Sequence, residues 1–484
     1  MDVKPTVGNL NVGDSDAEQR QTMSFYEPPV REEILKELWD SQFFTIITER
    51  EVDIEGNVYV PLCIRYLDKQ DTQCEETVAF VPFVKDTAVL ADYIETALSE
   101  KWGLNMEYCR GQAFLSVGEV GAQMKAVTTV ISQKYPLAVR TVSSAVSLNV
   151  WLARSSPAGE TAEGAASIED MLQWLTEDTE RQTQLDNMII HMFQHDEGKG
   201  NELRDKLIKN WEKSHDMHEV MVELLEVIML CLNELKGEAN SPASHYLNAV
   251  RSFEFIFSTV VLKNVLSLTR KFSQSLQGKP LDVLIAVSNL PDLQTSLSEL
   301  MSDIDNNHQA WFEEAVALAS KLQITMLHPP LLEPLSEFYK RAVSERLVEH
   351  VIAEVTELFT EQVLSTLSCL VIVPYAMSKL ESNSVAVHML RMYKDDLPDV
   401  ASLHTELKSW KEKWLDPMAG YLPATVLDTL KVSHIRSFSN FETLLRLLVI
   451  LPFSRKESTF RQGKRSLQGF VQQESRCIAE LHPL

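Results

Sequence analysis

FFTIITEREVDIEGNVYVPLCIRYLDKQDTQCEETVAFVPF, residues 43–83, is the stretch that decides the fold class of this 484-residue chain. It holds three runs of apolar and β-branched residues, Phe43–Thr48, Asn57–Leu67 and Glu76–Phe83, with turn-forming residues between them. Apolar side chains recur at every second position of the middle run, which is typical of a strand. The three runs therefore predict an antiparallel meander.

The residues on both sides of the meander extend it to a mixed α/β unit. The predicted elements are helices over Arg31–Asp40, Asp86–Trp102, 119–134 and 144–154, and strands over Arg110–Phe114 and Ala138–Val142. Asp86 is a good helix cap because its side chain can accept hydrogen bonds from the first free amides. We expect this unit to occupy residues 31–154, after a disordered tail over residues 1–30 that is rich in small polar groups.

A helical block follows the α/β unit. The stretch SSPAGETAEGAA, residues 155–166, has the composition of a linker. After it the strand pattern almost disappears, and residues 167–430 predict a succession of amphipathic helices. Asp216–Leu235 is the clearest of them, with apolar residues recurring at spacings of three and four. No fixed internal period is present, so a regular solenoid is not predicted.

The C-terminal segment, residues 435–484, combines a very apolar helix with a basic stretch. Phe441–Leu451 is nearly all apolar, so this helix must be buried in a core, in a dimer interface, or in both. The residues for such contacts are Leu444, Leu445, Leu447, Leu448 and Leu451. Pro452 ends the helix, and the basic residues that follow are Arg455, Lys456, Arg461, Lys464 and Arg465. Such a stretch contacts phosphate, directs nuclear import or, most often, forms a solvated helix face.

Composition narrows the classes of function. The chain has 69 acidic residues and 45 Lys and Arg, a formal net charge of -24, which repels phosphate backbones unless a basic patch intervenes. No uncharged apolar run approaches the roughly 20 residues that cross a bilayer, and the N-terminus lacks the apolar region of a secretory signal. We therefore expect a protein of the nucleus, the cytoplasm or both, without membrane contact and with nucleic-acid binding disfavoured.

Motifs for cofactors and metals are weak. The six cysteines are scattered without a CxxC pair, so neither a zinc finger nor a disulfide framework is predicted. His191 and His195 have the i, i+4 spacing of a zinc pair, and His215 and His218 are also close in sequence. Incidental histidines are much more common than ligands, so we expect no metal and no cofactor.

Longer stretches carry a resemblance to a known family. The run EKWGLNMEYCRGQAF, Glu100–Phe114, resembles the CRGQ motif of hAT-type DNA transposases. Further stretches resemble transposase-derived proteins that carry an N-terminal THAP zinc finger: residues 41–54, 147–155, 260–270, 311–315 and 444–460. The resemblance runs from about residue 30 to the end. It implies an RNase H-like α/β core interrupted by a large all-α insertion, predominantly helical overall, with the C-terminal segment returning to the core and supporting dimerisation.

The resemblance also places the catalytic acids. Active members hold two Mg²⁺ ions with three carboxylates. Their positions correspond here to Glu49, which is longer than the usual Asp, to Leu115, and to Glu457, which lies next to an apparent two-residue gap. An alkyl side chain cannot bind a hard cation. The imidazole and thiol groups of the HCxxH run are replaced as well, by Val142, Ser143 and Val146. We therefore expect a protein that is not an enzyme.

Three functions follow from this pattern. The first is a protein-interaction regulator, for which the resemblance implies relief of inhibition of the interferon-induced, double-stranded-RNA-activated kinase. Its partner would be the J-domain co-chaperone that inhibits this kinase. The second is a chromatin-associated regulator that binds DNA through the basic stretch, and the third is a residual Mg²⁺-dependent transposase or nuclease. The THAP finger is not expected in this chain, because its first cysteine, Cys63, already lies in the second strand.

Overall fold

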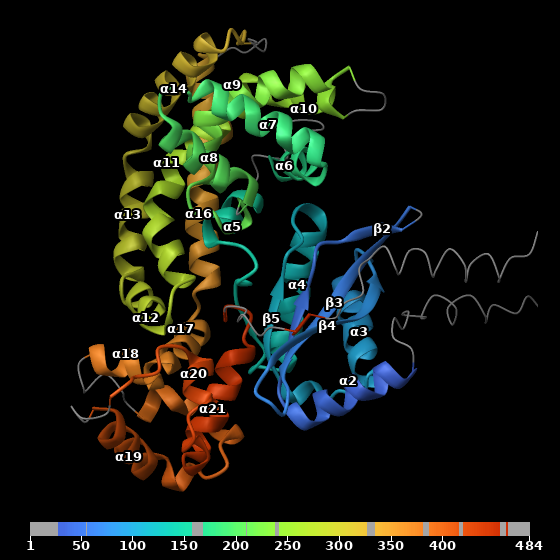
Figure 1. The fold of residues 1–484 in the computed structure, drawn as a ribbon, viewed down its shortest axis with the longest axis vertical. Helices are drawn as coiled ribbons and strands as arrows, with labels where there is room; N and C mark the ends of the chain where they lie inside the picture. The colour runs from blue at the N-terminus through green and yellow to red at the C-terminus, as the bar shows by residue number, and fades with distance from the viewer. Residues whose placement is uncertain are drawn as a thin grey trace, which may run out of the picture. The chain divides into compact units, whose positions relative to one another are not determined.

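The computed structural model describes residues 28–54, 56–156, 168–209, 211–237, 242–326, 334–380, 387–415, 420–454 and 461–462. They form two compact units, each of which is shown in Figure 1. The first comprises the described residues of the ranges 28–140, 450–452 and 461–462, and the second comprises the described residues of the ranges 141–449 and 453–454. Most of the expected tail and linker lies outside the described residues, although residues 28–30 of the tail are helical.

The first unit is built on a mixed sheet with the strand order β6-β5-β1-β3-β4-β7, in which β2 pairs with β3. Its strands are β1 Phe44–Thr48, β2 Val52–Ile54, β3 Asn57–Leu67, β4 Gln73–Pro82, β5 Cys109–Phe114, β6 Val139–Arg140 and β7 Arg461–Gln462. Strands β1, β3 and β4 form the predicted antiparallel meander. Strand β5 is parallel to β1, and β6 is parallel to β5. The sheet therefore contains the predicted meander and adds parallel strands to it, in agreement with the mixed α/β unit expected from the sequence.

The helices of this unit are α2 Pro28–Ser41, α3 Thr87–Thr96 and α4 Gly118–Lys134. Asp86 caps α3 as predicted, because its side chain accepts hydrogen bonds from the amides of Ala88 and Val89. The helix expected to run through Trp102 changes at Ala97 to one π-helical turn that ends at Lys101. One 3-10 turn, Met106–Tyr108, precedes β5.

The two faces of the sheet are covered differently. On one face, the Gln112 side chain donates to the carbonyl oxygens of Thr128 in α4 and Ala138, at 3.3 and 2.8 Å. On the other face, a Cβ atom added at Gly111 would lie 2.8 Å from Pro452 Cδ. The buried Arg65 side chain also donates to the Leu451 carbonyl at 3.0 Å. The Gly-Gln pair of the CRGQ run thus faces a helix on one side and the returning C-terminal segment on the other.

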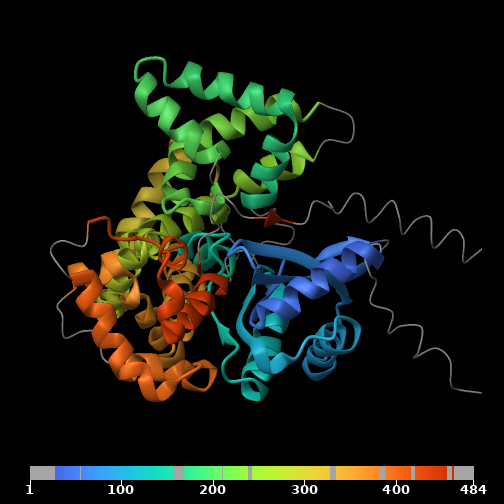
Figure 2. The same ribbon diagram turned by 60° about the horizontal axis from the view of Figure 1, so that its bottom comes forward.

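The second unit is helical (Figures 1 and 2), and its long helix α11 packs against both α14 and α9. Its α-helices are α5 Leu148–Arg154, α6 Ile168–Glu177, α7 Thr179–Met192, α8 Glu197–Lys209, α9 Met217–Leu235, α10 Ala243–Val250, α11 Phe253–Leu276, α12 Pro280–Ser288, α13 Leu290–Ser302, α14 Ile304–Lys321, α15 Leu335–Tyr339, α16 Glu345–Leu358, α17 Glu361–Ser368, α18 Pro374–Lys379, α19 Leu403–Leu415, α20 Val426–Leu430 and α21 Ser439–Ile450. Short 3-10 or π turns are Trp211–Lys213, Lys340–Ser344, Cys369–Ile372, Val387–Asp396, Val400–Ser402 and Ile435–Ser437.

Helix α5 corrects one sequence boundary. It was expected to begin at residue 144 and to close the α/β unit at residue 154, but it begins at Leu148 and belongs to the helical unit. The reason is a hydrogen-bonded anchor: the Asn149 side chain donates to the carbonyls of His215 and Leu266, at 2.8 and 2.9 Å. Thr269 donates to the amide oxygen of Asn149 at 2.6 Å. A buried asparagine is stable only when its polar atoms find such partners.

Helix α21 contains most of the apolar C-terminal run. The side chains of Leu444, Leu445, Leu447, Leu448 and Leu451 are all 0% exposed. Trp410 of α19 stacks on Phe441 of α21 with ring centroids 4.9 Å apart. The helix is therefore part of a core, which is one of the two roles that its composition predicted, whereas a homodimer stays a prediction.

In the described part of the chain, no single helix is long and apolar enough to cross a bilayer. Two bent helix pairs, Ala243–Val250 with Phe253–Leu276 and Leu335–Leu358 with Glu361–Ile372, have the length and composition to do so together.

Candidate functional site

The structure places two of the three inferred catalytic positions side by side. Glu49 directly follows β1 and Leu115 directly follows β5, and these strands pair in parallel with Thr48 opposite Phe114. The Leu115 amide donates to the Thr48 carbonyl at 2.9 Å, so the pairing continues one residue beyond the strands. Glu457 lies outside the described residues. The positions that the resemblance assigns to the first two catalytic acids, Glu49 and Leu115, therefore lie next to each other at the ends of two neighbouring strands.

The chemistry at these two positions does not fit a pair of Mg²⁺ ions. Mg²⁺ requires oxygen ligands in near-octahedral geometry at about 2.0–2.1 Å. Leu115 is half-buried and offers only carbon atoms at the position that corresponds to the second acid. Ser116, the next residue, donates its hydroxyl to the Glu49 carbonyl oxygen at 3.3 Å. Neither Leu115 nor Ser116 replaces the missing carboxylate.

Glu49 instead belongs to a group of three polar side chains. Potential ligand atoms of Glu49, Cys63 and Glu75 all lie within 4.8 Å of one another. The pairing explains why: Cys63 of β3 lies opposite Ile47 of β1, and residues two apart on a strand point to the same face. A register shift between Leu62 and Cys63 in the β3–β4 pair brings Glu75 to the same face. We call Glu49, Cys63 and Glu75 the donor cluster.

Buried charge surrounds the donor cluster. Arg65 is 0% exposed and contacts the Glu75 carboxylate at 3.4 Å. Burial lowers the pKa of Arg65, and Glu75 opposes this shift. Burial also raises the pKa of the Cys63 thiol, and the negative charge of Glu49 raises it further. The thiol is therefore protonated near neutral pH and is a poor nucleophile.

Sequence reasoning missed Cys63, Arg65 and Glu75. A signal was present for Cys63 and Arg65, because the predicted meander put them on its second strand, and β3 is buried on both faces. Glu75 lay one residue before the third predicted strand, whereas β4 begins at Gln73 and includes it. A polar residue on a strand buried on both sides must find a polar partner. Which partner it finds depends on the register, which the residue pattern of the meander does not fix.

Known proteins resemble the chain in two ways. Residues 11–125 match the family described as the ZMYM1/FAM200 RNase-like domain. The human "52 kDa repressor of the inhibitor of the protein kinase" is 37% identical over 478 residues, which cover 94% of this chain and 63% of that protein. The mouse protein of the same name is 36% identical over 479 residues, with the same coverage. The chain is a homologue of these repressors.

This homologue spans about 63% of the length of the two repressors. No solved structure matches it. The match to an RNase-like family confirms the fold class expected from the sequence, a mixed sheet followed by many helices. The long similarity to the repressors confirms the transposase-derived resemblance. Activity, partners and compartment of this repressor homologue stay predictions.

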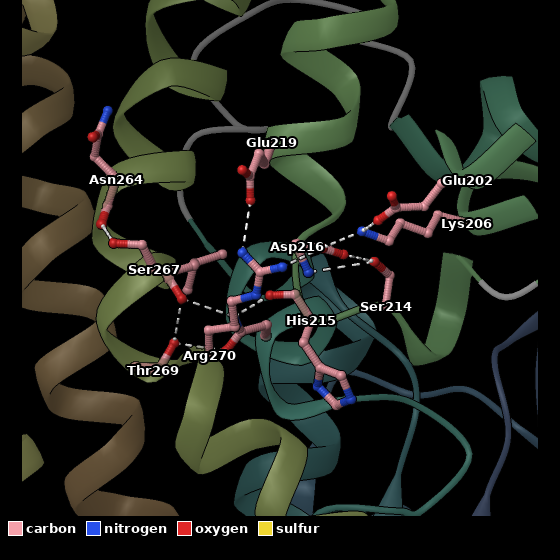
Figure 3. Close-up of polar contacts among 12 residues, drawn as sticks. Glu202, Lys206, Ser214, His215, Asp216, Glu219, Asn264, Ser267, Thr269 and Arg270 are labelled. Atoms are coloured by element: carbon pink, nitrogen blue, oxygen red, sulfur yellow. Dashed lines mark hydrogen bonds and ion pairs between the residues drawn. The ribbon is translucent and has the colours of Figure 1, made fainter. Parts of the chain in front are cut away.

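The helical unit of the repressor homologue contains a second polar cluster, drawn in Figure 3. Asp216, just before α9, accepts hydrogen bonds from Lys206 of α8 at 2.8 Å and from Arg270 of α11 at 2.6 Å. Ser214 donates to the same carboxylate at 3.0 Å. Burial acts to raise the pKa of Asp216, but hydrogen bonds and positive charge outweigh it, so the pKa lies below its usual value. The cluster ties three helices together.

The histidines beside this cluster have structural roles. The Nδ1 atom of His215 lies 2.8 Å from the Ser273 hydroxyl, and burial lowers the pKa of this imidazole. Burial lowers the pKa of His218 to about 4, so this ring is neutral in the fold. His191 and His195 are exposed. Among the residues that the structure describes, the three-donor group with metal-ligand spacing contains none of these histidines.

The predicted basic stretch is mostly outside the described residues, which include none of the side chains of Arg455, Lys456, Arg461, Lys464 and Arg465. The backbone of Arg461 pairs with Cys74 where β7 joins the edge of the sheet. The phosphate-binding and import roles of this stretch stay predictions.

Proposed function

We propose that this repressor homologue is a catalytically inactive, transposase-derived protein that acts by binding other proteins. One observation carries the first half of this proposal: Leu115 occupies the position beside Glu49 where a second metal-binding acid is required. A two-metal mechanism clamps the attacking and leaving oxygens between the ions, so an incomplete ligand set does not support it.

The kind of partner follows from the relatives. The two repressors are named for opposing an inhibitor of a protein kinase. By homology, this chain binds such an inhibitor and relieves inhibition of its kinase. The resemblance recognised in the sequence makes the inhibitor a J-domain co-chaperone and the kinase the interferon-induced, double-stranded-RNA-activated one. The complex would form in the cytoplasm, the nucleus or both.

A groove in the helical unit supports binding of a protein. It lies along α7 and α9, and its apolar floor includes Met188, Val227 and Leu230. Leu230 is 52% exposed and lies beside Met188 and Val227 in the lining, so the groove offers apolar surface to a partner. Glu180 and Glu234 are the charged residues of the lining, apart from His191.

The shape and charge of this groove define its occupant. A groove lined by two neighbouring helices, with apolar residues among its lining, can accept an amphipathic helix. Because the acidic groups of the lining have no Lys or Arg among the other lining residues, we infer that the partner presents a helix with basic residues beside its apolar face. The net charge of -24 favours association with the same kind of partner.

The catalytic half is tested with purified full-length chain, supercoiled plasmid and either Mg²⁺ or Mn²⁺. We expect no nicking or strand cleavage. Metal-dependent cleavage that disappears in Glu49→Gln would overturn the proposal, because a contaminating nuclease would be unaffected by that substitution.

The binding half is tested by titrating the purified J-domain inhibitor against the chain and two matched variants. Leu230→Asp places a charge in the groove, whereas Ile285→Asp does so at a similarly exposed position, 43%, on α12 outside it. Loss of a central contact worth about 2 kcal/mol predicts roughly 30-fold weaker binding for Leu230→Asp. Ile285→Asp should bind like the parent. Equal affinities for both variants would reject the groove, and absence of binding by the parent would reject the partner.

A further inference from the structure

The donor cluster has the composition of a transition-metal site that differs from the one an active transposase requires. We propose that Glu49, Cys63 and Glu75 bind one divalent ion of the zinc type in the β-rich unit. The ligands are one thiolate and two carboxylates from the end of β1, from β3 and from β4. Leu115, which removes the Mg²⁺ site, takes no part in this one.

The spacing suits such an ion. Tetrahedral zinc with bonds of about 2.0–2.3 Å holds its ligand atoms roughly 3.3–3.6 Å apart. The donor atoms of the cluster already lie within 4.8 Å of one another. A shift of about 1 Å therefore closes the site, and the rotatable bonds of two glutamates supply it without moving the strands. Three protein ligands leave a fourth position for water or another small ligand.

Neighbouring residues form hydrogen bonds with the donor side chains, as the residues around known metal sites do with the metal ligands. Ligating carboxylates are generally hydrogen-bonded by a second group, and Arg65 contacts Glu75 at 3.4 Å. The hydroxyl of Thr77 lies 3.1 Å from Cys63 Sγ and orients this side chain. Cys63 is 3% exposed, so the sulfur is shielded from competing thiols, while half-buried Glu49 leaves a route for the ion.

Charge decides both the need for a cation and its type. Before the ion binds, the thiol is protonated, so the two carboxylates and the Arg65 guanidinium leave a net charge of -1. With the thiolate that metal binding creates, the sum is -2, which one divalent ion neutralises in a buried region where uncompensated charge is costly. A thiolate favours Zn²⁺ or Co²⁺ over Mg²⁺, because soft sulfur ligands select borderline metals. When the ion binds, the sulfur–hydrogen bond of Cys63 breaks, a sulfur–metal bond forms, and the proton passes to solvent.

The test is a titration of chelator-treated full-length chain with Co²⁺. Binding should produce the near-ultraviolet band of a thiolate–Co²⁺ bond at one ion per chain, and Zn²⁺ but not Mg²⁺ should remove it. Cys63→Ser should abolish the band. Glu49→Gln should lower the affinity by more than the roughly 10- to 100-fold that loss of an outer partner costs.

Two variants serve as matched controls. Cys74→Ser removes another buried thiol from the same pair of strands, but Cys74 pairs with Tyr66 on the opposite face. Asp53→Asn removes one negative charge four residues after Glu49 in the sequence, from a side chain that accepts a hydrogen bond from the Gly56 amide. Both should titrate like the parent chain.

Three results would overturn the proposal: no band in the parent chain, a band that survives Cys63→Ser, or equal losses in Glu49→Gln and Asp53→Asn. If circular dichroism shows that Cys63→Ser does not fold, the Co²⁺ affinities of Glu49→Gln and Asp53→Asn are compared instead. Glu49 is half-buried, and a loss of affinity in Glu49→Gln alone then supports the site.

Discussion

Replacing Asp216 by Asn should loosen the helical unit far more than replacing its neighbour Glu219 by Gln. Asp216 is contacted by Lys206 and Arg270, and its side chain is only 10% exposed. Glu219 contacts the same arginine at 2.8 Å but is 51% exposed (Figure 3). The two variants each remove one negative charge from one cluster, so their difference measures the effect of burial.

The magnitude follows from the exposure of the partners. Breaking a fully buried pair costs about 3–5 kcal/mol, whereas an exposed pair is worth about 0–1 kcal/mol. Lys206 and Arg270 are about one third exposed, and each retains a second carboxylate, Glu202 and Glu219 respectively. After discounting for solvent screening, we expect about 2 kcal/mol for Asp216→Asn and at most about 0.5 kcal/mol for Glu219→Gln.

Hydrogen–deuterium exchange of peptides from α8, α9 and α11 measures the loss of local stability in these helices. A local measurement is needed because the chain has two units, so a single unfolding transition cannot be assigned to one of them. A loss of 2 kcal/mol corresponds to roughly 30-fold faster exchange in these helices. Because the pKa of Asp216 is lowered in the fold, its contribution is present above the ordinary carboxylate pKa and is lost as the pH falls through the folded value. The parent should therefore approach the Asp216→Asn variant in acid. Equal exchange in both variants near neutral pH would refute the assigned role of burial.

Three further variants test other parts of the fold. Gly111→Ala places a Cβ 2.8 Å from both Pro452 and Thr45, so overpacking should lower the free energy of unfolding by about 1–3 kcal/mol. Gly237→Ala, which has open space around the added Cβ, should not lower it. Equal melting temperatures of the two variants would contradict the close approach at Gly111. His218→Gln should flatten the acid limb of the stability curve. The parent keeps its full stability above the ordinary histidine pKa of 6.5 and loses up to about 3 kcal/mol as the pH falls to about 4, and an unchanged acid limb in the variant would show that His218 is not the group. Glu406→Ala removes the carboxylate that accepts hydrogen bonds from the Phe441 amide and the Asn440 side chain, at 3.0 and 2.7 Å. The loss of about 2 kcal/mol of hydrogen bonding should speed hydrogen exchange at the start of α21 by roughly 30-fold. Unchanged exchange there would show that Glu406 does not cap this helix.

Local patterns in the sequence were enough for much of this architecture. The period of two in β3, the cap at Asp86 and the apolar run of α21 each depend on residues that are neighbours in the chain. Such signals predict an element and whether it is buried, because strand and helix periodicity directly determine which side chains share a face. The resemblance added the positions of Glu49 and Leu115, and the parallel pairing of β1 and β5 brings them together.

The tertiary structure alone decided which distant residues meet. The donor cluster depends on a register shift between β3 and β4, and a displacement by one residue would turn Glu75 to the other face. The membership of α5 in the helical unit depends on the hydrogen bonds of Asn149 to carbonyls more than sixty residues away. Register and packing partners are set by the free energy of the whole fold, in which each contact requires many others to be in place, so no local stretch of the sequence contains them.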